Sequence, residues 1–182
     1  MTPIIAIVGM PGAGKTRAGN FFKEKGMEVL WFGSVVVEGV ESQGLPDTPE
    51  NEANYREKIR QELGMAAVAI KMLPKIKKAL EEGKRIVLDG LYSWEEYITL
   101  KKELPDLFLL CIYASPKTRY ERLSVRQERT ITPDEARKRD VRELENLNKG
   151  GPIAIADYLI KNEGTKEEFT AELEKFLSTI SS

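Results

Sequence analysis

The chain has 182 residues, of which 41% are hydrophobic and 31% are charged, and its formal net charge is −1. These values fit one soluble globular domain with a full-sized core, and they leave no room for a second catalytic domain. The interleaved charges argue against a nucleic-acid partner, and the lack of histidine excludes histidine acid–base catalysis and a Cys/His zinc site.

No apolar run approaches the roughly 18 residues that a membrane span needs. The first apolar run begins almost at the N-terminus, without the basic region and cleavage site of a secretory signal. The sequence therefore predicts a cytoplasmic protein with no membrane partner. The single cysteine, Cys111, lies within an apolar run, where its expected role is core packing.

Five short apolar runs predict the strands of one sheet. They cover residues 4–8, 28–32, 85–88, 107–113 and 158–160. Apart from Glu28 and Arg85 at the start of two of them, the runs are continuously apolar rather than alternating, which is typical of strands buried on both faces. Helical stretches separate the runs, so the order predicts an α/β fold with a five-stranded parallel sheet and helices on both faces. Ligands of such sheets lie beyond the carboxyl ends of the strands.

A complete G-x-x-x-x-G-K-[ST] pattern follows the first apolar run. It consists of Gly9, Met10, Pro11, Gly12, Ala13, Gly14, Lys15 and Thr16. The glycines allow successive backbone N–H groups to point at a polyphosphate, Lys15 would neutralise the β and γ phosphates, and the Thr16 hydroxyl would bind Mg²⁺. The motif predicts a phosphate-binding P-loop for a nucleoside triphosphate. The alternative is a glycine turn that binds nothing.

Hydroxyl side chains mark the expected helix starts. Thr48, Ser115 and Thr132 each precede a proline, which is favoured at the first helical position. Ser93, Thr132 and Thr165 each have a glutamate three residues later, which is the spacing of a capping box.

The helical region 49–82 is too long for a single crossover helix, and Gly64 and Pro74 are expected to interrupt it. In P-loop kinases, an insertion between the second and third strands receives the phosphate acceptor, and this region lies in that interval. We therefore expect a helical acceptor-side insertion over about 34–82 within one kinase-like domain that spans residues 1–182. The alternative is a helical hairpin that only covers the sheet.

A carboxylate, Asp89, follows the third apolar run directly. This is the position of a Walker-B-type aspartate, which would hold or polarise a water bound to Mg²⁺ beside Thr16. The alternative is that Asp89 and Gly90 form a simple turn after the strand.

Arginines accumulate after the fourth apolar run. Arg119, Arg122 and Arg126 are spaced to share one face of the helix expected from Pro116. Phosphoryl transfer needs cations around the equatorial oxygens, so these three are candidates for phosphate or base contacts, and we expect an arginine-rich closing lid over about 126–150. The alternative is a solvated face paired with nearby acidic residues.

These motifs together resemble an archaeal family of P-loop proteins related to adenylate kinase and dephospho-coenzyme A kinase. The matching segments are 8–15, 62–69, 88–90, 139–144 and 156–165, so the similarity runs nearly end to end. The resemblance implies a nucleoside-monophosphate-kinase-like fold. It also implies that Asn162, Glu163 and Gly164 border the edge of the adenine ring, with Arg119 packed on the ring face.

The chain departs from the family pattern at three polar positions. Ser34 and Val37 stand where that pattern has aspartate and arginine, and Tyr92 stands where it has a second arginine. In adenylate kinases an arginine near the first place grips the phosphate of the acceptor, so the case for a nucleoside monophosphate acceptor is weakened. Glu38 could replace the lost carboxylate as a base.

The sequence favours an ATP- and Mg²⁺-dependent kinase whose acceptor is a small molecule, either a nucleotide or a coenzyme precursor. Its expected catalytic residues are Lys15, Asp89, Arg122 and Arg126. The three departures support one alternative, a regulatory module or weak ATPase that binds ATP but has lost acceptor phosphorylation. A switch GTPase is excluded because no aspartate is followed by glycine three residues later. The oligomeric state stays open.

Overall fold

A five-stranded parallel sheet forms the centre of the protein. The computed structural model describes residues 3–127 and 130–180. The strands are β1 (Ile4–Val8), β2 (Glu28–Trp31), β3 (Ile86–Asp89), β4 (Leu107–Tyr113) and β5 (Tyr158–Lys161). They lie in the order β2-β3-β1-β4-β5, and all neighbouring pairs are parallel. The predicted α/β fold and its five strands are therefore confirmed.

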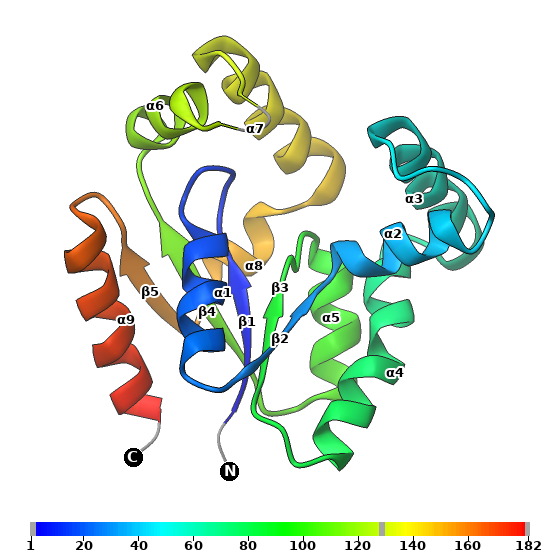
Figure 1. The fold of residues 1–182 in the computed structure, drawn as a ribbon, viewed down its shortest axis with the longest axis horizontal. Helices are drawn as coiled ribbons and strands as arrows, with labels where there is room; N and C mark the ends of the chain where they lie inside the picture. The colour runs from blue at the N-terminus through cyan, green and yellow to red at the C-terminus, as the bar shows by residue number, and fades with distance from the viewer. Residues whose placement is uncertain (1–2, 128–129, 181–182) are drawn as a thin grey trace.

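Helices cover both faces of the sheet (Figure 1). One face carries α1 (Lys15–Glu24) and α9 (Lys166–Ile180). The other carries α4 (Ala67–Glu81), α5 (Trp94–Glu103) and the short α8 (Gly150–Ala154). Each interface is a separate apolar core, with Phe22 and Phe176 in the first and Phe32, Met72 and Ile76 in the second, all of them fully buried. The central strands β3, β1 and β4 place buried apolar residues in both cores, which accounts for their continuous apolar runs, whereas Leu159 on the edge strand β5 is 55% exposed.

Four further helices stand beyond the carboxyl ends of the strands (Figure 1). The pair α2 (Gly33–Glu41) and α3 (Pro49–Leu63) follows β2, and the pair α6 (Pro116–Val125) and α7 (Pro133–Leu147) follows β4. The P-loop lies at the same end of the sheet, directly after β1. The two helix pairs therefore flank the edge at which ligands of parallel sheets bind.

The helix-start predictions are confirmed. The hydroxyls of Thr48, Ser115 and Thr132 each accept a hydrogen bond from a backbone N–H in the first turn of the following helix. Complete capping boxes form at Ser93 and Thr132. Thr165 also exchanges two hydrogen bonds with the glutamate three residues further on. These caps fix where each helix begins because they satisfy N–H groups that have no partner within the helix.

Two helix predictions were wrong. Gly64 does end α3, but Pro74 lies inside an unbroken α4. Pro74 is on the exposed side of α4, so water can satisfy the carbonyl that its missing N–H leaves open. Helix α6 ends at Val125, and Arg126 has an extended backbone (ψ 150°), so Arg126 does not share a helical face with Arg119 and Arg122. Helix α2 falls within the helical insertion expected over about 34–82, although no side-chain cap marks where it begins.

Within the ranges 3–127 and 130–180, no helix combines the length and apolar character that crossing a membrane would require.

Candidate functional site

The P-loop is built by close backbone approaches that only glycine permits. Gly9 has φ 144°, and a Cβ there would lie 2.3 Å from the carbonyl oxygen of Ile112. Gly14 has φ 111°, and a Cβ there would lie 2.4 Å from the side-chain nitrogen of Asn162. The loop therefore rests tightly against the ends of β4 and β5. Within the loop, the N–H of Ala13 donates to the carbonyl oxygen of Met10 at 3.2 Å. A glycine-rich backbone of this kind can present its other N–H groups to a phosphate.

The Lys15 ammonium group closes back over the loop that precedes it. Its Nζ donates hydrogen bonds to the carbonyl oxygens of Gly9 (2.9 Å) and Met10 (3.1 Å). Burial and the positive charge of Lys149 together lower the pKa of Lys15 to about 7, against the opposing charges of Glu143 and Asp89. A polyphosphate in the loop would supply the counter-charge that this ammonium group lacks.

Thr16 and Asp89 line one cavity of about 330 Å³, which runs between α1 and β2 and reaches Asp89 at the end of β3. The sheet register sets Asp89 beside Ile7 of β1 and Trp31 of β2, so its carboxylate stands next to the P-loop strand. Burial raises the pKa of Asp89, and the charge of Lys15 opposes that rise. A hydroxyl and a carboxylate facing one space beside a phosphate loop are oxygen ligands suited to Mg²⁺ and its waters.

Arg122 and Arg126 line a second cavity, of about 210 Å³, together with Gly12, Lys15 and Thr16. Arg122 also donates to the backbone oxygen of Asn162 at 3.0 Å. The tertiary structure therefore brings both predicted arginines to the P-loop, although they do not lie on the same helical face.

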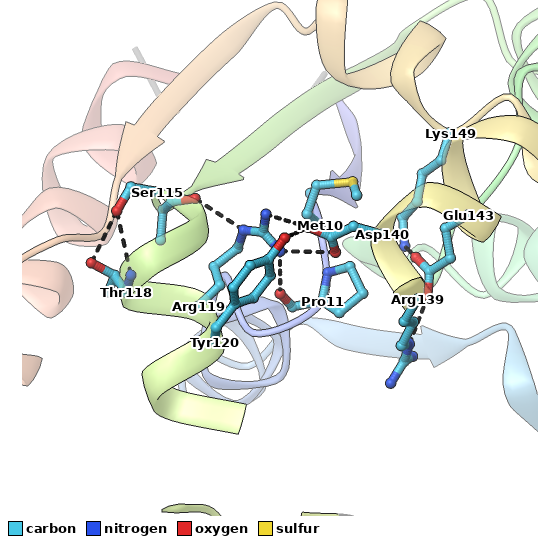
Figure 2. A network of polar contacts seen from close by, with 12 residues as sticks. Met10, Pro11, Ser115, Thr118, Arg119, Tyr120, Arg139, Asp140, Glu143 and Lys149 are labelled. Carbon is cyan, nitrogen blue, oxygen red and sulfur yellow. Dashed lines mark hydrogen bonds and ion pairs between the residues drawn. The ribbon is translucent and has the colours of Figure 1, made fainter. Parts of the chain in front are cut away.

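Arg119 is buried behind the P-loop (Figure 2). Its guanidinium group forms a two-pronged ion pair with Asp140 of α7, with N···O distances of 3.0 and 2.6 Å. The same group donates to the carbonyl oxygens of Pro11 (3.0 Å) and Ala114 (3.1 Å), and Tyr120 donates to Asp140 at 2.9 Å. Arg119 thus ties α7 to the P-loop, a contact that sequence spacing had not indicated.

The segment 162–164 also borders the P-loop. The buried Asn162 donates from its side chain to the carbonyl oxygen of Ala13 at 2.7 Å. Glu163 accepts hydrogen bonds from the Thr118 hydroxyl and the Ser115 backbone N–H, and these bonds hold the pKa of Glu163 below its usual value. Gly164 is exposed. The end of β5 is thereby locked to both the P-loop and the start of α6.

A buried lysine that the sequence had not singled out completes the site. Lys149 is only 2% exposed; it forms an ion pair with Glu143, which in turn accepts from Arg139 at 2.8 Å (Figure 2). Its Nζ also lies 4.6 Å from the centre of the Tyr92 ring. Although burial would raise the pKa of Glu143, Lys149 and Arg139 keep it below its usual value. The only sequence signal was the Asn-Lys-Gly-Gly-Pro turn, which shows where a helix ends but not what the lysine contacts.

Of the three positions that depart from the family pattern, Tyr92 lies at this site. Tyr92 is covered by Lys149, and burial raises the pKa of its hydroxyl to about 12. Glu38 pairs with Lys75 of α4, which also donates to Ser34 at 3.3 Å. Neither Glu38 nor Ser34 lines either of the two cavities beside the P-loop.

Comparison with known proteins defines the class first. Residues 5–145 match a family described as an AAA domain. The chain also superimposes on shikimate kinase from Bacteroides thetaiotaomicron (TM-score 0.64, 13% identity, 99% of each chain). A gluconokinase from Sinorhizobium meliloti 1021 aligns likewise (TM-score 0.61, 15% identity, 98% of this chain and 93% of that one). These likenesses show an α/β P-loop fold of the kinase-like type.

The sequence relatives then define the family. A UPF0200 protein of Pyrococcus abyssi is 36% identical over 181 residues, which cover 97% of this chain and 96% of the relative. The chain belongs to the UPF0200 family. The expected resemblance to an archaeal P-loop family is therefore confirmed.

Proposed function

We propose that this protein transfers the γ-phosphoryl group of ATP to a small-molecule acceptor. The observation that carries the proposal is the gathering of Lys15, Arg122 and Arg126 around the P-loop, with Lys149 beside Lys15. Cations arranged in this way stabilise the charge on a transferring phosphoryl group. The solved structures with the same fold include a shikimate kinase and a gluconokinase, which supports phosphoryl transfer as the reaction class.

The proposed step is a direct displacement at phosphorus. An acceptor oxygen forms a bond to the γ phosphorus, the bond from that phosphorus to the β,γ-bridging oxygen breaks, and ADP leaves with the electron pair. If the acceptor is a hydroxyl, its proton passes to solvent or to a carboxylate. Lys15 would hold the β and γ phosphates, and Arg122 and Arg126 would contact the transferring group.

Thr16 and Asp89 would hold Mg²⁺ and its waters, and this ion would neutralise charge on the β and γ phosphates. Residues 162–164 and Arg119 border the loop, and we assign them to the adenine side of the nucleotide. We assign 34–82 to the acceptor side and 126–150 to a closing lid.

Labelled ATP provides the direct test. The protein is incubated with γ-labelled ATP, Mg²⁺ and separate pools of nucleotides and coenzyme precursors. We expect label in an acceptor, and a loss of at least about 100-fold in Lys15→Ala, because the loop then lacks its cation. Lys102→Ala is the matched control, since Lys102 is exposed on α5.

The two outcomes are distinct. Label found only in inorganic phosphate, with ATP tightly bound, would contradict acceptor phosphorylation. That result would favour the regulatory module, which the replacements at Ser34, Val37 and Tyr92 also support.

A further inference from the structure

A cavity of about 740 Å³ lies between α3 and α7. Its lining includes Arg56 and Arg60 from α3 and Arg139 and Arg142 from α7, and we call it the arginine cavity. This volume falls in the range of about 300–1,000 Å³ that small-molecule sites occupy. Four arginines from two separate elements therefore face one space of ligand size.

Within the described part of the chain, two of the four arginines form no direct ion pair, although the charge of Glu96 acts on Arg60. Arg56 is held by Glu52 at 3.0 Å and Arg139 by Glu143 at 2.8 Å. Among the residues that the structure describes, neither Arg60 nor Arg142 forms an ion pair or a side-chain hydrogen bond, and the Nε atom of Arg60 is buried without a partner. A buried donor that lacks an acceptor costs free energy, which a bound anion would recover.

The acidic residues of the lining are already occupied. Glu135 accepts the backbone N–H and the hydroxyl of Thr132 in the cap of α7. Glu143 is shared between Arg139 and Lys149. The cavity therefore keeps a net positive charge that is suited to an oxyanion.

The arginine cavity is also linked to the phosphate end of the site. Arg139 lines it, and the pairing partner of Arg139, Glu143, holds Lys149, whose charge acts on Lys15. A ligand in the arginine cavity would therefore approach the P-loop from the side of α3 and α7.

We propose that the arginine cavity is the acceptor site and that the acceptor carries an oxyanion, either a phosphate monoester or a carboxylate. This assignment rests on the proposed kinase function. The acceptor's oxyanion binds Arg60 and Arg142, which leaves its reactive oxygen to face the P-loop. A neutral acceptor would leave both guanidinium groups unpaired.

Binding of simple anions tests the proposal without turnover. The protein is saturated with Mg²⁺ and a non-hydrolysable ATP analogue, so that the P-loop is filled, and is then titrated calorimetrically with inorganic phosphate, succinate or glycerol. We expect saturable binding of phosphate or succinate but not of glycerol. Phosphate alone would identify a phosphate monoester, and succinate alone would identify a carboxylate.

Variants separate this site from general charge effects. In Arg60→Gln and Arg142→Gln, the dissociation constant of the anion is expected to rise at least about tenfold. Arg137→Gln is the matched control, because Arg137 lies on the same helix, is exposed and does not line the arginine cavity. Thermal melting checks that each variant folds.

Binding of neither anion, or unchanged binding in both variants, would overturn the proposal. Failure of the kinase proposal looks different: anions would still bind in an Arg60-dependent manner, while γ-labelled ATP would yield no labelled acceptor.

Discussion

Nucleotide binding should be coupled to protonation of Lys15. In the free protein, burial and the charge of Lys149 lower the pKa of Lys15 from 10.5 to about 7. A bound triphosphate favours the charged ammonium form and should raise this pKa again. The phosphates of the nucleotide have their last pKa near about 6, so above that range Lys15 is the group expected to take up the proton.

The size of the effect follows from that pKa. With a pKa of about 7, about 90% of Lys15 is neutral at pH 8 and about 10% at pH 6. Binding at pH 8 should therefore take up about 0.9 proton, and binding at pH 6 only about 0.1. The apparent dissociation constant should rise up to about tenfold per pH unit above pH 7, because each bound nucleotide needs the protonated lysine.

Calorimetry in two buffers with different ionisation enthalpies measures the proton uptake directly. In Lys149→Met, the repulsive charge is lost and Glu143 loses its lysine partner, so the pKa of Lys15 should rise and the uptake at pH 8 should fall. Lys102→Met, an exposed change on α5, should leave it unaltered. Equal binding heats in both buffers at pH 8, with an affinity that does not change from pH 7 to 9, would refute the reasoning.

Three further predictions concern the framework of the site. Asp140→Asn leaves the buried Arg119 guanidinium group without its anion. The free energy of unfolding should therefore fall by about 3–5 kcal/mol and the Tm by roughly 10 °C. A Tm within about 2 °C of that of the parent protein would contradict this prediction. Gly14→Ala should weaken ATP binding at least about tenfold by calorimetry, because a Cβ would lie 2.4 Å from a side-chain nitrogen at φ 111°. Burial raises the pKa of Glu96 from 4.5 to about 7, so the folded state binds more protons than the unfolded state between these values, and stability should fall as pH rises through them. Glu96→Gln should remove this slope in urea denaturation, and a wild-type profile flat from about pH 5 to 7.5 would exclude it.

Much of the fold could be predicted because it depends on residues that are contiguous in sequence. The five strands could be predicted because each is a short, mainly apolar run. The helix starts could be predicted because a cap needs only a hydroxyl and its near neighbours. The P-loop could be recognised because its glycines, Lys15 and Thr16 are adjacent in sequence.

Pro74 is a position at which prediction from local sequence fails. A proline inside a helix removes one hydrogen bond, and its ring clashes with the carbonyl of residue i−4. The helix can continue more easily where that carbonyl can tilt toward solvent and bond to water, which depends on whether the position is exposed. Pro74 is exposed in α4, while Met72 and Ile76 anchor the helix to the core. Exposure is a property of the packed structure, so the sequence pattern alone predicted a break.

Sequence alone thus determined the sheet, the caps and the phosphate loop. Only the tertiary structure decided which charged groups interact. It pairs Arg119 with Asp140, brings the charge of Lys149 close to Lys15, and places Arg60 in the lining of the arginine cavity. The physical reason is the separation along the chain between the residues that interact. Strand, cap and loop signals act between residues close in sequence, whereas the partner and pKa of a charged side chain depend on which distant segments the folded chain buries around it.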